Sequence, residues 1–397
     1  MNPELAKLHP YPFEKLSQLK QGCEPPADKP HIALSIGEPK HPTPGFITEA
    51  VIAHLHGLSS YPTTAGTNEL RHAIATWLDN RFKLDGHINA ISQVLPVNGT
   101  REALFAFAQA VIDRSQDPVV LMPNPFYQIY EGAAILAGAE PVYLNCTAQN
   151  NFIPDFDAVE ESTWKRCQLL YICSPGNPTG AVIDKATLTQ LIELAHQYDF
   201  VIAADECYSE IYDDAAEAPV GLLEAAHEAG YTDLSRCVVF HSLSKRSNSP
   251  GLRSGFVAGD AVILKQFLRY RTYHGCSMPP ATQAASISAW SDEAHVVHNR
   301  ELYQEKFKAV LEILSPVMNV SMPQAGFYLW AETPVADTQF ARLLFEQQHV
   351  TVLPGSYLGR DTAKGNPGAN RVRMALVAPL EECIEAAERI RSLIESL

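Results

Sequence analysis

The stretch from Val238 to Lys245, with the sequence VVFHSLSK, places a lysine just beyond a short apolar run. Arg253 follows eight residues later, and another short apolar run, Phe256–Ala258, comes soon after it. Such runs are typical of strands that are buried on both faces of a parallel sheet. Because ligands bind at the carboxyl ends of the strands in open α/β sheets, this stretch predicts a binding site at Lys245.

Further apolar runs alternate with helical stretches on both sides of this segment. The predicted strands are Gln93–Val97, Val119–Met122, Pro141–Leu144, Leu169–Cys173, Phe200–Ala204, Val238–His241 and Phe256–Ala258. Apolar residues recur at helical spacing in Arg101–Ile112, Phe126–Ala137, Lys185–Tyr198 and Ala261–Tyr270. Helices between buried strands imply parallel crossovers. Residues 46–285 are therefore predicted to form a large α/β domain, whose mostly parallel central sheet is flanked by helices.

The two ends of the chain are expected to form a second, smaller α+β domain. Residues 1–45 are rich in proline and are predicted to be an N-terminal arm that contributes part of this domain. A long helical stretch, Thr282–Leu314, leads into residues 286–397. The elements predicted beyond it are the strands Gly326–Trp330, Val350–Leu353 and Val372–Val377 and the helices Ala336–Gln348 and Pro379–Leu397.

Composition excludes several classes of partner. The 397 residues include 30 Lys and Arg against 45 Asp and Glu, a net charge of −15, which disfavours nucleic acids and anionic membranes. The eight cysteines are scattered without a C-x-x-C pair, so neither a metal site nor a disulfide framework is predicted. The first residues lack the pattern of a signal peptide, and no apolar run approaches the roughly 18 residues of a membrane helix. We expect a cytoplasmic protein.

Polar side chains or the start of a helix follow four of the predicted strands. Gly99 follows the first, Asn177 lies in the turn SPGNPTG, and Asp205 and Tyr208 follow Phe200–Ala204. Each of these residues has an ordinary explanation when taken alone, such as a helix cap for Asp205 or a turn for Asn177. Their order and spacing together with Lys245 are far more specific than any one of them.

This set of residues resembles the class I/II aminotransferases among the fold-type I pyridoxal 5′-phosphate enzymes. The resemblance runs from Gly37 to Arg373, and its most specific part is SLSK, ending at Lys245, with Arg253 following. Ser249 and Ser254 depart from the pattern, which usually has aliphatic residues there. The resemblance implies the fold-type I aminotransferase fold and pyridoxal 5′-phosphate as the cofactor.

The resemblance also implies the catalytic roles. Lys245 would bind the cofactor aldehyde covalently and then act as the base that moves a proton. A lysine with an ordinary pKa near 10.4 is a poor base at neutral pH, so burial and a neighbouring cation such as Arg253 are expected to lower its pKa. Asp205 would pair with the pyridine nitrogen, and Tyr208 and Asn177 would bind the ring 3-oxygen.

Binding roles come from the same resemblance. Tyr127 would stack on the ring, and the implied phosphate-binding set is Gly99, Thr100, Arg101, Ser242, Ser244 and Arg253. Gly37, Asn177 and Arg373 would bind the substrate, with Arg373 clamping its α-carboxylate. Tyr61 would reach the phosphate of a neighbouring subunit, which implies a homodimer with shared active sites.

Other classes of function compete with this interpretation. The SLSK tetrapeptide satisfies S-x-x-K, the nucleophile signature of penicillin-binding serine hydrolases. That chemistry needs S-D-N and K-T-G elements, and here Ser291-Asp292-Glu293 breaks the first while the second does not occur. A non-catalytic regulatory domain of the same fold would carry an added DNA-binding module, which the first 45 residues do not offer. A carbon–sulfur lyase of the same fold would keep the same cofactor residues and stays open.

Four flanking motifs narrow the expected substrate. The segments LHPYPFEKL (8–16), SIGEPKHP (35–42), NGTREAL (98–104) and SKRSN (244–248) resemble those of bacterial succinyldiaminopimelate aminotransferases. This resemblance implies amino transfer from N-succinyl-LL-2,6-diaminopimelate to 2-oxoglutarate in lysine and diaminopimelate biosynthesis, giving N-succinyl-2-amino-6-oxopimelate and glutamate. Aspartate, aromatic and acetylornithine aminotransferases are the alternatives. The candidate cations for the distal carboxylates are Lys40, Arg101, Arg246 and Arg271.

Overall fold

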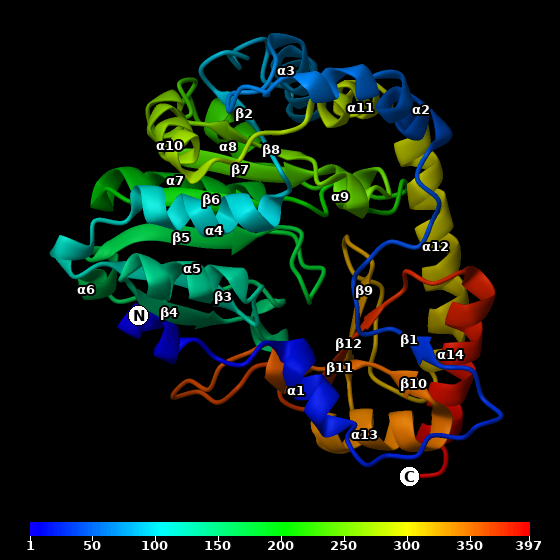
Figure 1. The fold of residues 1–397 in the computed structure, drawn as a ribbon. Helices are drawn as coiled ribbons and strands as arrows, with labels where there is room; N and C mark the ends of the chain where they lie inside the picture. Colours follow the sequence, from blue (N-terminus) through cyan, green and yellow to red (C-terminus); the bar gives the residue numbers. More distant parts are fainter.

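The computed structural model describes all residues, 1–397, and contains a large α/β domain built on a seven-stranded sheet (Figure 1). The sheet order is β2-β8-β7-β6-β5-β3-β4. The strands are β2 (Val94–Val97), β3 (Val119–Asn124), β4 (Glu140–Asn145), β5 (Cys167–Cys173), β6 (Val201–Asp205), β7 (Cys237–Ser242) and β8 (Gly255–Gly259). Each strand begins and ends within two residues of its predicted position, and the fold class predicted from the sequence is confirmed.

One strand of the sheet runs against the others. β8 pairs antiparallel with both β2 and β7, whereas the pairs β3–β4, β3–β5, β5–β6 and β6–β7 are parallel. Only the short helix α9 (Leu243–Arg246) and a 3₁₀ turn separate β7 from β8, and this connection turns the chain back on itself. The sheet is therefore mostly rather than fully parallel, as the sequence predicts.

Helices cover both faces of this sheet, because successive strand residues point to opposite faces. Leu170 and Ile172 of β5 lie in one core, and Leu169 and Tyr171 lie in the other. Helices α3 (Asn68–Phe82), α7 (Lys185–Tyr198), α8 (Leu222–Glu228) and α11 (Pro280–Trp290) pack on the first core. Helices α4 (Thr100–Val111), α5 (Ile129–Ala137) and α10 (Ala261–His274) pack on the second. The short helix α6 (Glu161–Trp164) and helix α2 (Gly45–Ala53) complete the large domain.

Local signals determine where these helices begin and end. The side chain of Asp184 accepts a hydrogen bond from the backbone N–H of Thr187 at 2.8 Å and so caps the start of α7. The helix ends at Tyr198 and is followed by the capping residue Asp199, which has a positive φ of 65°. The predicted helix Lys185–Tyr198 has the same bounds as α7.

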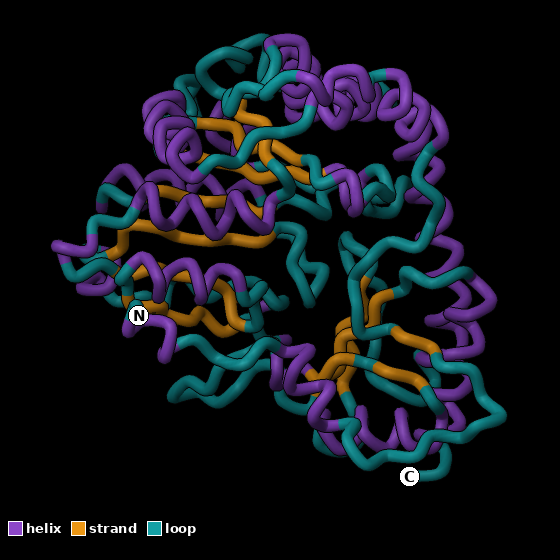
Figure 2. Tube along the Cα trace, viewed as in Figure 1, coloured by secondary structure: helices purple, strands orange, loops and turns teal.

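The smaller group of strands lies apart from the large sheet (Figure 2). It contains an antiparallel sheet of β9 (Tyr328–Glu332), β11 (Leu353–Pro354) and β12 (Arg371–Ala375), in the order β11-β12-β9. From the N-terminal arm, β1 (Ile32–Ala33) pairs with β10 (Val350–Thr351). Helices α13 (Asp337–Gln348) and α14 (Leu380–Ile394) pack here, and α1 (Pro12–Leu19) contacts β11.

The long helical stretch predicted over Thr282–Leu314 is two helices in the structure. α11 ends at Trp290 and α12 runs over Ala294–Leu314. The carboxylate of Asp292 accepts a hydrogen bond from the backbone N–H of His295 at 3.0 Å, as a helix cap does, which explains the break. No helix of the structure has the length and apolar character needed to cross a membrane.

Candidate active site

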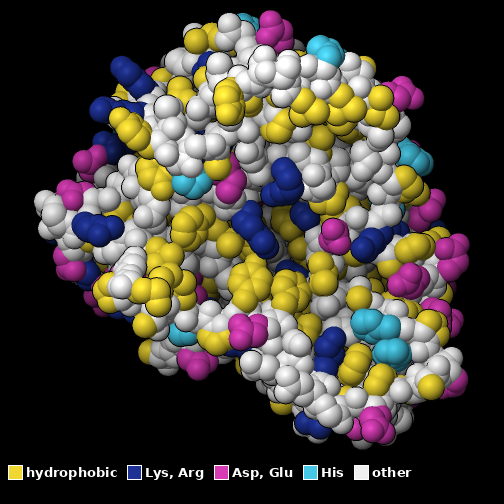
Figure 3. Space-filling view, viewed as in Figure 1, with side chains coloured by type: hydrophobic (Ala, Val, Ile, Leu, Met, Phe, Trp, Pro, Cys, Tyr) yellow, Lys and Arg dark blue, Asp and Glu magenta, His cyan; other side chains and the backbone are white.

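A cavity of about 560 Å³ lies between the large sheet and the smaller group of strands. Figure 3 shows this hollow with lysine and arginine side chains gathered in it. The predicted site residues that line the cavity are Gly37, Thr100, Arg101, Tyr127, Asn177, Asp205, Tyr208, Ser242, Ser244, Lys245, Arg253 and Arg373. The carboxyl ends of β5, β6 and β7 supply much of its floor, as expected for an α/β sheet.

Asp205 is the last residue of β6, and its carboxylate is buried at the floor of the cavity. The hydroxyl of Tyr130 donates to its Oδ2 at 2.7 Å, and the backbone N–H of Cys207 donates to its Oδ1 at 3.3 Å. Burial raises the pKa of Asp205, and these two donors act in the opposite direction. Tyr130 was not identified from the sequence, because no motif distinguishes it from the other aromatic residues of its helix.

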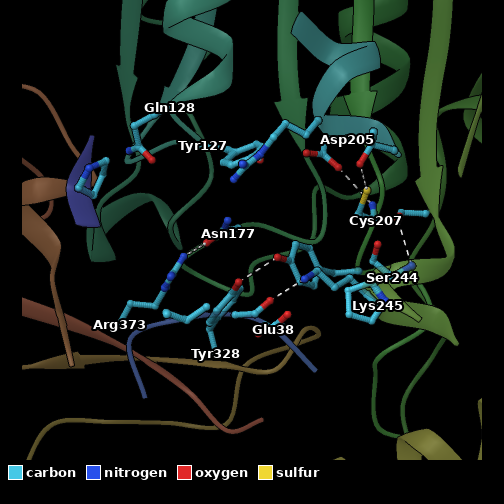
Figure 4. Close-up of a pocket in the computed structure, with 18 of the residues that line it drawn as sticks. Glu38, Tyr127, Gln128, Asn177, Asp205, Cys207, Ser244, Lys245, Tyr328 and Arg373 are labelled. Atoms are coloured by element: carbon cyan, nitrogen blue, oxygen red, sulfur yellow. Dashed lines mark hydrogen bonds between the residues drawn. The ribbon is translucent and has the colours of Figure 1, made fainter. Parts of the chain in front are cut away.

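Lys245 lies in α9, directly beyond the end of β7 (Figure 4). Its amine donates to the backbone carbonyl of Gly37 at 2.5 Å. Burial, assisted by the positive charges of Arg373 and Arg253, lowers the pKa of Lys245 to about 8. An amine that loses its proton this readily can serve as a base near neutral pH.

The start of α4 and Arg253 form a cradle of hydrogen-bond donors. Gly99 has a positive φ of 89°, and a Cβ at this position would overlap the guanidinium of Arg253. The first N–H groups of α4, which include those of Thr100 and Arg101, have no partner within the helix. Arg253 forms no ion pair in the structure. This cradle offers hydrogen-bond donors and a positive charge that no carboxylate neutralises, so it is suited to binding a phosphate group.

Arg373 of β12 approaches the cavity from the opposite side. Its Nη1 donates to Oδ1 of Asn177 at 2.9 Å, and its Nη2 donates to the carbonyl of Ser35 at 2.7 Å. Its Nε is buried without a hydrogen-bond partner, and no carboxylate pairs with this side chain. A buried guanidinium with an unused donor is suited to binding the carboxylate of a ligand.

Two tyrosines meet beside Arg373. The hydroxyl oxygens of Tyr208 and Tyr328 are 3.0 Å apart, and the guanidinium of Arg373 lies 4.4 Å from the ring centroid of Tyr328. A Cβ on Gly37 would overlap the hydroxyl of Tyr328, so this approach requires glycine. Tyr328 was missed from the sequence, because it lies within a strand pattern that carries no motif.

Arg101 and two tyrosine hydroxyls form the wall beside the arm. Arg101 donates from Nε to the hydroxyl of Tyr127 at 2.6 Å and from Nη2 to that of Tyr11 at 3.2 Å. Tyr127 lines the cavity, whereas the neighbouring Phe126 stacks on Tyr143 instead. Arg101 is exposed and has no carboxylate partner. Tyr11 was not expected here from the sequence.

The structure does not bring every predicted residue to the cavity. Arg246 is buried, where it pairs with Glu293 and donates to the carbonyls of Ala289 in the last turn of α11 and of Asp292 just beyond it. Arg271 donates to both oxygens of Glu102 at 2.8 Å. Both arginines therefore bind acceptors within the protein and do not line the cavity. The prediction that they bind the distal carboxylates of a substrate is wrong.

Three further predicted residues do not line the cavity: Gly99, which adjoins the guanidinium of Arg253, Lys40 and Tyr61. Lys40 is exposed and pairs with Glu38 at 3.4 Å, but it does not line the cavity. Tyr61 is fully exposed on this chain, so its contact with a neighbouring subunit stays a prediction.

Comparison with known proteins places this geometry in a family. The family model for aminotransferase class I and II matches residues 29–390. An LL-diaminopimelate aminotransferase of Desulforudis audaxviator is 31% identical over 98% of this chain and 97% of its own length. The crystal structure of an aminotransferase from Neisseria meningitidis has a TM-score of 0.95 at 51% identity, covering 99% of this chain and 100% of its own. A protein of Thermus thermophilus described as a probable N-succinyldiaminopimelate aminotransferase has a TM-score of 0.83 at 26% identity, covering 96% and 99%. This chain belongs to the class I and II aminotransferase family.

Proposed function

We propose that this aminotransferase transfers the amino group of N-succinyl-LL-2,6-diaminopimelate to 2-oxoglutarate. The products are N-succinyl-2-amino-6-oxopimelate and glutamate, in lysine and diaminopimelate biosynthesis. The sequence motifs and the likeness to the Thermus thermophilus protein support this substrate. The observation that carries the proposal is the position of Arg101, a cation without a carboxylate partner that lines the same cavity as Arg373.

Enzymes of this family depend on pyridoxal 5′-phosphate, and the donors of the cavity fit this cofactor. When bound, it supplies an aldehyde that links to amines and a ring that withdraws electrons. The cradle at Gly99 and Arg253 would hold its phosphate, and Asp205 would accept from its ring nitrogen. Tyr208 and Asn177 would bind the ring oxygen, and Tyr127 would lie against the ring.

Lys245 would hold the cofactor covalently and afterwards move a proton with its freed amine. With a pKa of about 8, roughly a tenth of the amine is unprotonated at pH 7, compared with less than a thousandth for an ordinary lysine. The carbonyl of Gly37 accepts from this amine and directs it within the cavity. Charge on Asp205 favours a protonated ring nitrogen, because opposite charges stabilise each other in a buried site.

Arg373 and Arg101 would each bind a different carboxylate of the substrate. Arg373 would bind the α-carboxylate next to the reacting amine through two parallel hydrogen bonds. Arg101 would bind a distal carboxylate, because its guanidinium already lies among hydroxyl groups and has no ion pair that must first be broken. An acidic protein with a net charge of −15 depends on such local cations to hold an anionic substrate.

The test is a steady-state comparison of amino donors with 2-oxoglutarate as acceptor. N-succinyl-LL-2,6-diaminopimelate is expected to give the highest kcat/KM among donors that include acetylornithine, aspartate and an aromatic amino acid. A higher kcat/KM with aspartate or an aromatic amino acid contradicts the proposed substrate. Release of ammonia and pyruvate from a cystathionine-type thioether, without amino transfer, would favour the carbon–sulfur lyase.

LL-Diaminopimelate itself is a second candidate substrate, supported by the name of the Desulforudis audaxviator relative. It lacks the succinyl group, so it offers one carboxylate fewer at the distal end. The same comparison separates the two candidates when both compounds are assayed at equal concentrations. The proposed substrate requires that removal of the succinyl group lowers kcat/KM.

We also propose a homodimer with shared active sites. Exposed apolar residues support an interface beside α2, since Ile52, Leu58 and Tyr61 have exposed fractions of 63%, 72% and 103%. Tyr61 would then bind the cofactor phosphate in the partner's cavity.

A further inference from the structure

A buried lysine outside the cavity has no carboxylate partner. The side chain of Lys306 in α12 is 3% exposed and forms no ion pair in the structure. Its Nζ lies 2.6 Å from Nε2 of His41 and 3.4 Å from the carbonyl of Val377. It also lies 5.1 Å from the ring centroid of Tyr303. A buried ammonium group that is held only by neutral partners calls for an explanation.

Lys306 determines which nitrogen of His41 carries the proton. Burial lowers the pKa of Lys306 to about 8, so most of this amine is still protonated at neutral pH. An ammonium group can only donate, so Nε2 of His41 accepts from it and Nδ1 must bear the hydrogen. That Nδ1 lies 2.9 Å from Oδ1 of Asn299 and donates to it. Burial lowers the pKa of His41, and the charge of Lys306 lowers it further, which keeps the imidazole neutral. His41 is therefore a donor of fixed direction toward Asn299.

Asn299 links His41 to the backbone of Lys245 through hydrogen bonds. Its Nδ2 donates to the carbonyl of Lys245 at 3.3 Å, and its Oδ1 also accepts from Nδ2 of Asn248 at 2.8 Å. The amide orientation of Asn299 is fixed, because two donors converge on its oxygen. Asn299 is itself buried, so no solvent competes for these hydrogen bonds.

The segment that contains His41 reaches Lys245 a second time. The carbonyl of Gly37, four residues before His41, accepts from the amine of Lys245 at 2.5 Å. His41 thus secures one end of a short segment whose other end contacts the reacting amine. A loss of order at His41 would displace the Gly37 carbonyl and the Lys245 backbone together.

We propose that His41 is a positioning residue for Lys245: through Asn299 it holds the backbone of Lys245, and through its own segment it holds the carbonyl that directs the amine. Lys306 serves as the cation that sets the tautomer of His41 at neutral pH. This inference rests on the proposed role of Lys245 in binding the cofactor.

Two substitutions at the same position separate this role from a purely structural one. His41→Asn places an amide N–H near the position of Nδ1, so it keeps the donor to Asn299 and loses the contact with Lys306. His41→Gln places an amide oxygen near the position of Nε2, so it keeps the contact with Lys306 and loses the donor to Asn299. His298→Asn is the matched control, because His298 lies exposed on the same helix as Asn299 and Lys306.

Three readouts apply to each variant: the pH midpoint of the visible absorbance of the bound cofactor, the kcat and KM values, and the melting temperature of the protein without cofactor. His41→Gln is expected to shift the absorbance midpoint and to lower kcat about fivefold to tenfold, with KM nearly unchanged, as for the loss of one buried hydrogen bond. His41→Asn is expected to keep the midpoint and kcat near those of the control.

The opposite pattern of effects in the two His41 variants would contradict the proposal. If His41→Gln behaves like the control while His41→Asn lowers only the melting temperature, His41 serves merely to satisfy Lys306. Unchanged midpoints in both variants also overturn it. A Lys245→Met variant that still binds the cofactor covalently would instead refute the proposed function, so the two failures are distinguishable.

Discussion

The hydroxyl of Tyr130 in α5 donates to Oδ2 of Asp205 at the end of β6 across 2.7 Å. Both groups are buried, so this hydrogen bond stabilises the carboxylate where solvent cannot. Tyr130 thereby acts on the residue proposed to hold the ring nitrogen of the cofactor without lining the cavity itself.

Tyr130→Phe is expected to shift the acid limb of the kcat/KM profile to higher pH. The hydrogen bond favours the ionised carboxylate, so its removal raises the pKa of Asp205 further, and the ionised form is lost at a higher pH. A hydrogen bond to a charged group contributes about 1.5–3 kcal/mol, or roughly one to two pH units. Tyr171→Phe is the control, because this buried hydroxyl donates to the carbonyl of Leu104 instead. Equal profiles for both variants would contradict the role of Tyr130.

Lys245→Met is expected to abolish covalent binding of the cofactor, with a change in the visible spectrum, and nearly all turnover. A positioned base can be worth an effective concentration of about 10⁵ M or more, which a base from solution does not replace. The visible spectrum and single-turnover assays measure both effects. A variant whose cofactor stays attached to the denatured chain after borohydride reduction would show that another amine binds the cofactor.

The same substitution is expected to stabilise the protein without cofactor. The pKa of Lys245 is about 8 in the folded protein, against an ordinary value of 10.5, so the unfolded chain holds the extra proton between these values. Lys245 therefore opposes folding fully below pH 8, by up to about 3 kcal/mol, and this cost disappears as the pH rises toward 10.5. Melting temperatures at pH 7 and pH 10 should show a gain for Lys245→Met that is larger at pH 7.

Arg373→Lys is expected to weaken both half-reactions. Lysine keeps the charge but loses the paired donors that a carboxylate needs, and one charge-assisted hydrogen bond accounts for roughly 10- to 150-fold in kcat/KM. Measurements with the amino donor and with 2-oxoglutarate should show losses of similar size. A loss confined to one of the two substrates would show that Arg373 does not bind the α-carboxylate of both.

Arg101→Gln is expected to lower kcat/KM for the succinylated donor more than for glutamate. The backbone N–H of residue 101 remains, so cofactor affinity should change little. Lys40→Gln is the matched control, because Lys40 is exposed and does not line the cavity. Equal losses of kcat/KM with both donors would show that Arg101 does not bind a distal carboxylate.

Leu58→Arg is expected to convert the proposed homodimer into inactive monomers. A charged side chain in an apolar interface removes burial and adds a desolvation cost. Light scattering measures the mass, and Lys7→Glu, a change of charge at a position remote from α2 in the sequence, is the control. A wild-type chain that is monomeric and active at assay concentrations would contradict the dimer.

Local patterns in the sequence determined the strands, the order of the polar residues behind them and the family. A short apolar run is buried wherever it lies, and the residues directly after each strand of a parallel sheet come to the same edge. For this reason Lys245, Asp205 and Asn177 meet at one cavity in the structure, where Arg373 joins them from the smaller group of strands. Family membership also excludes the serine hydrolase interpretation of SLSK.

Only the tertiary structure decided which side chains the site residues contact. Tyr130, Tyr328 and Tyr11 are separated by long stretches of chain from the residues they serve, so no spacing along the sequence predicts these contacts. The reversal of β8 and the break before α12 depend likewise on a short connection and on a single capping carboxylate.

The four candidate cations show the same difference between what the sequence predicts and what the tertiary structure decides. The sequence predicts positive charge near the motifs, but the burial of a guanidinium depends on the partners that the fold places around it. Arg246 meets the free carbonyls at the end of α11, Arg271 meets Glu102, and Arg101 alone meets the cavity. A charge becomes available to a ligand only where the folded chain leaves it without a partner, and that is a property of three-dimensional packing rather than of residue order.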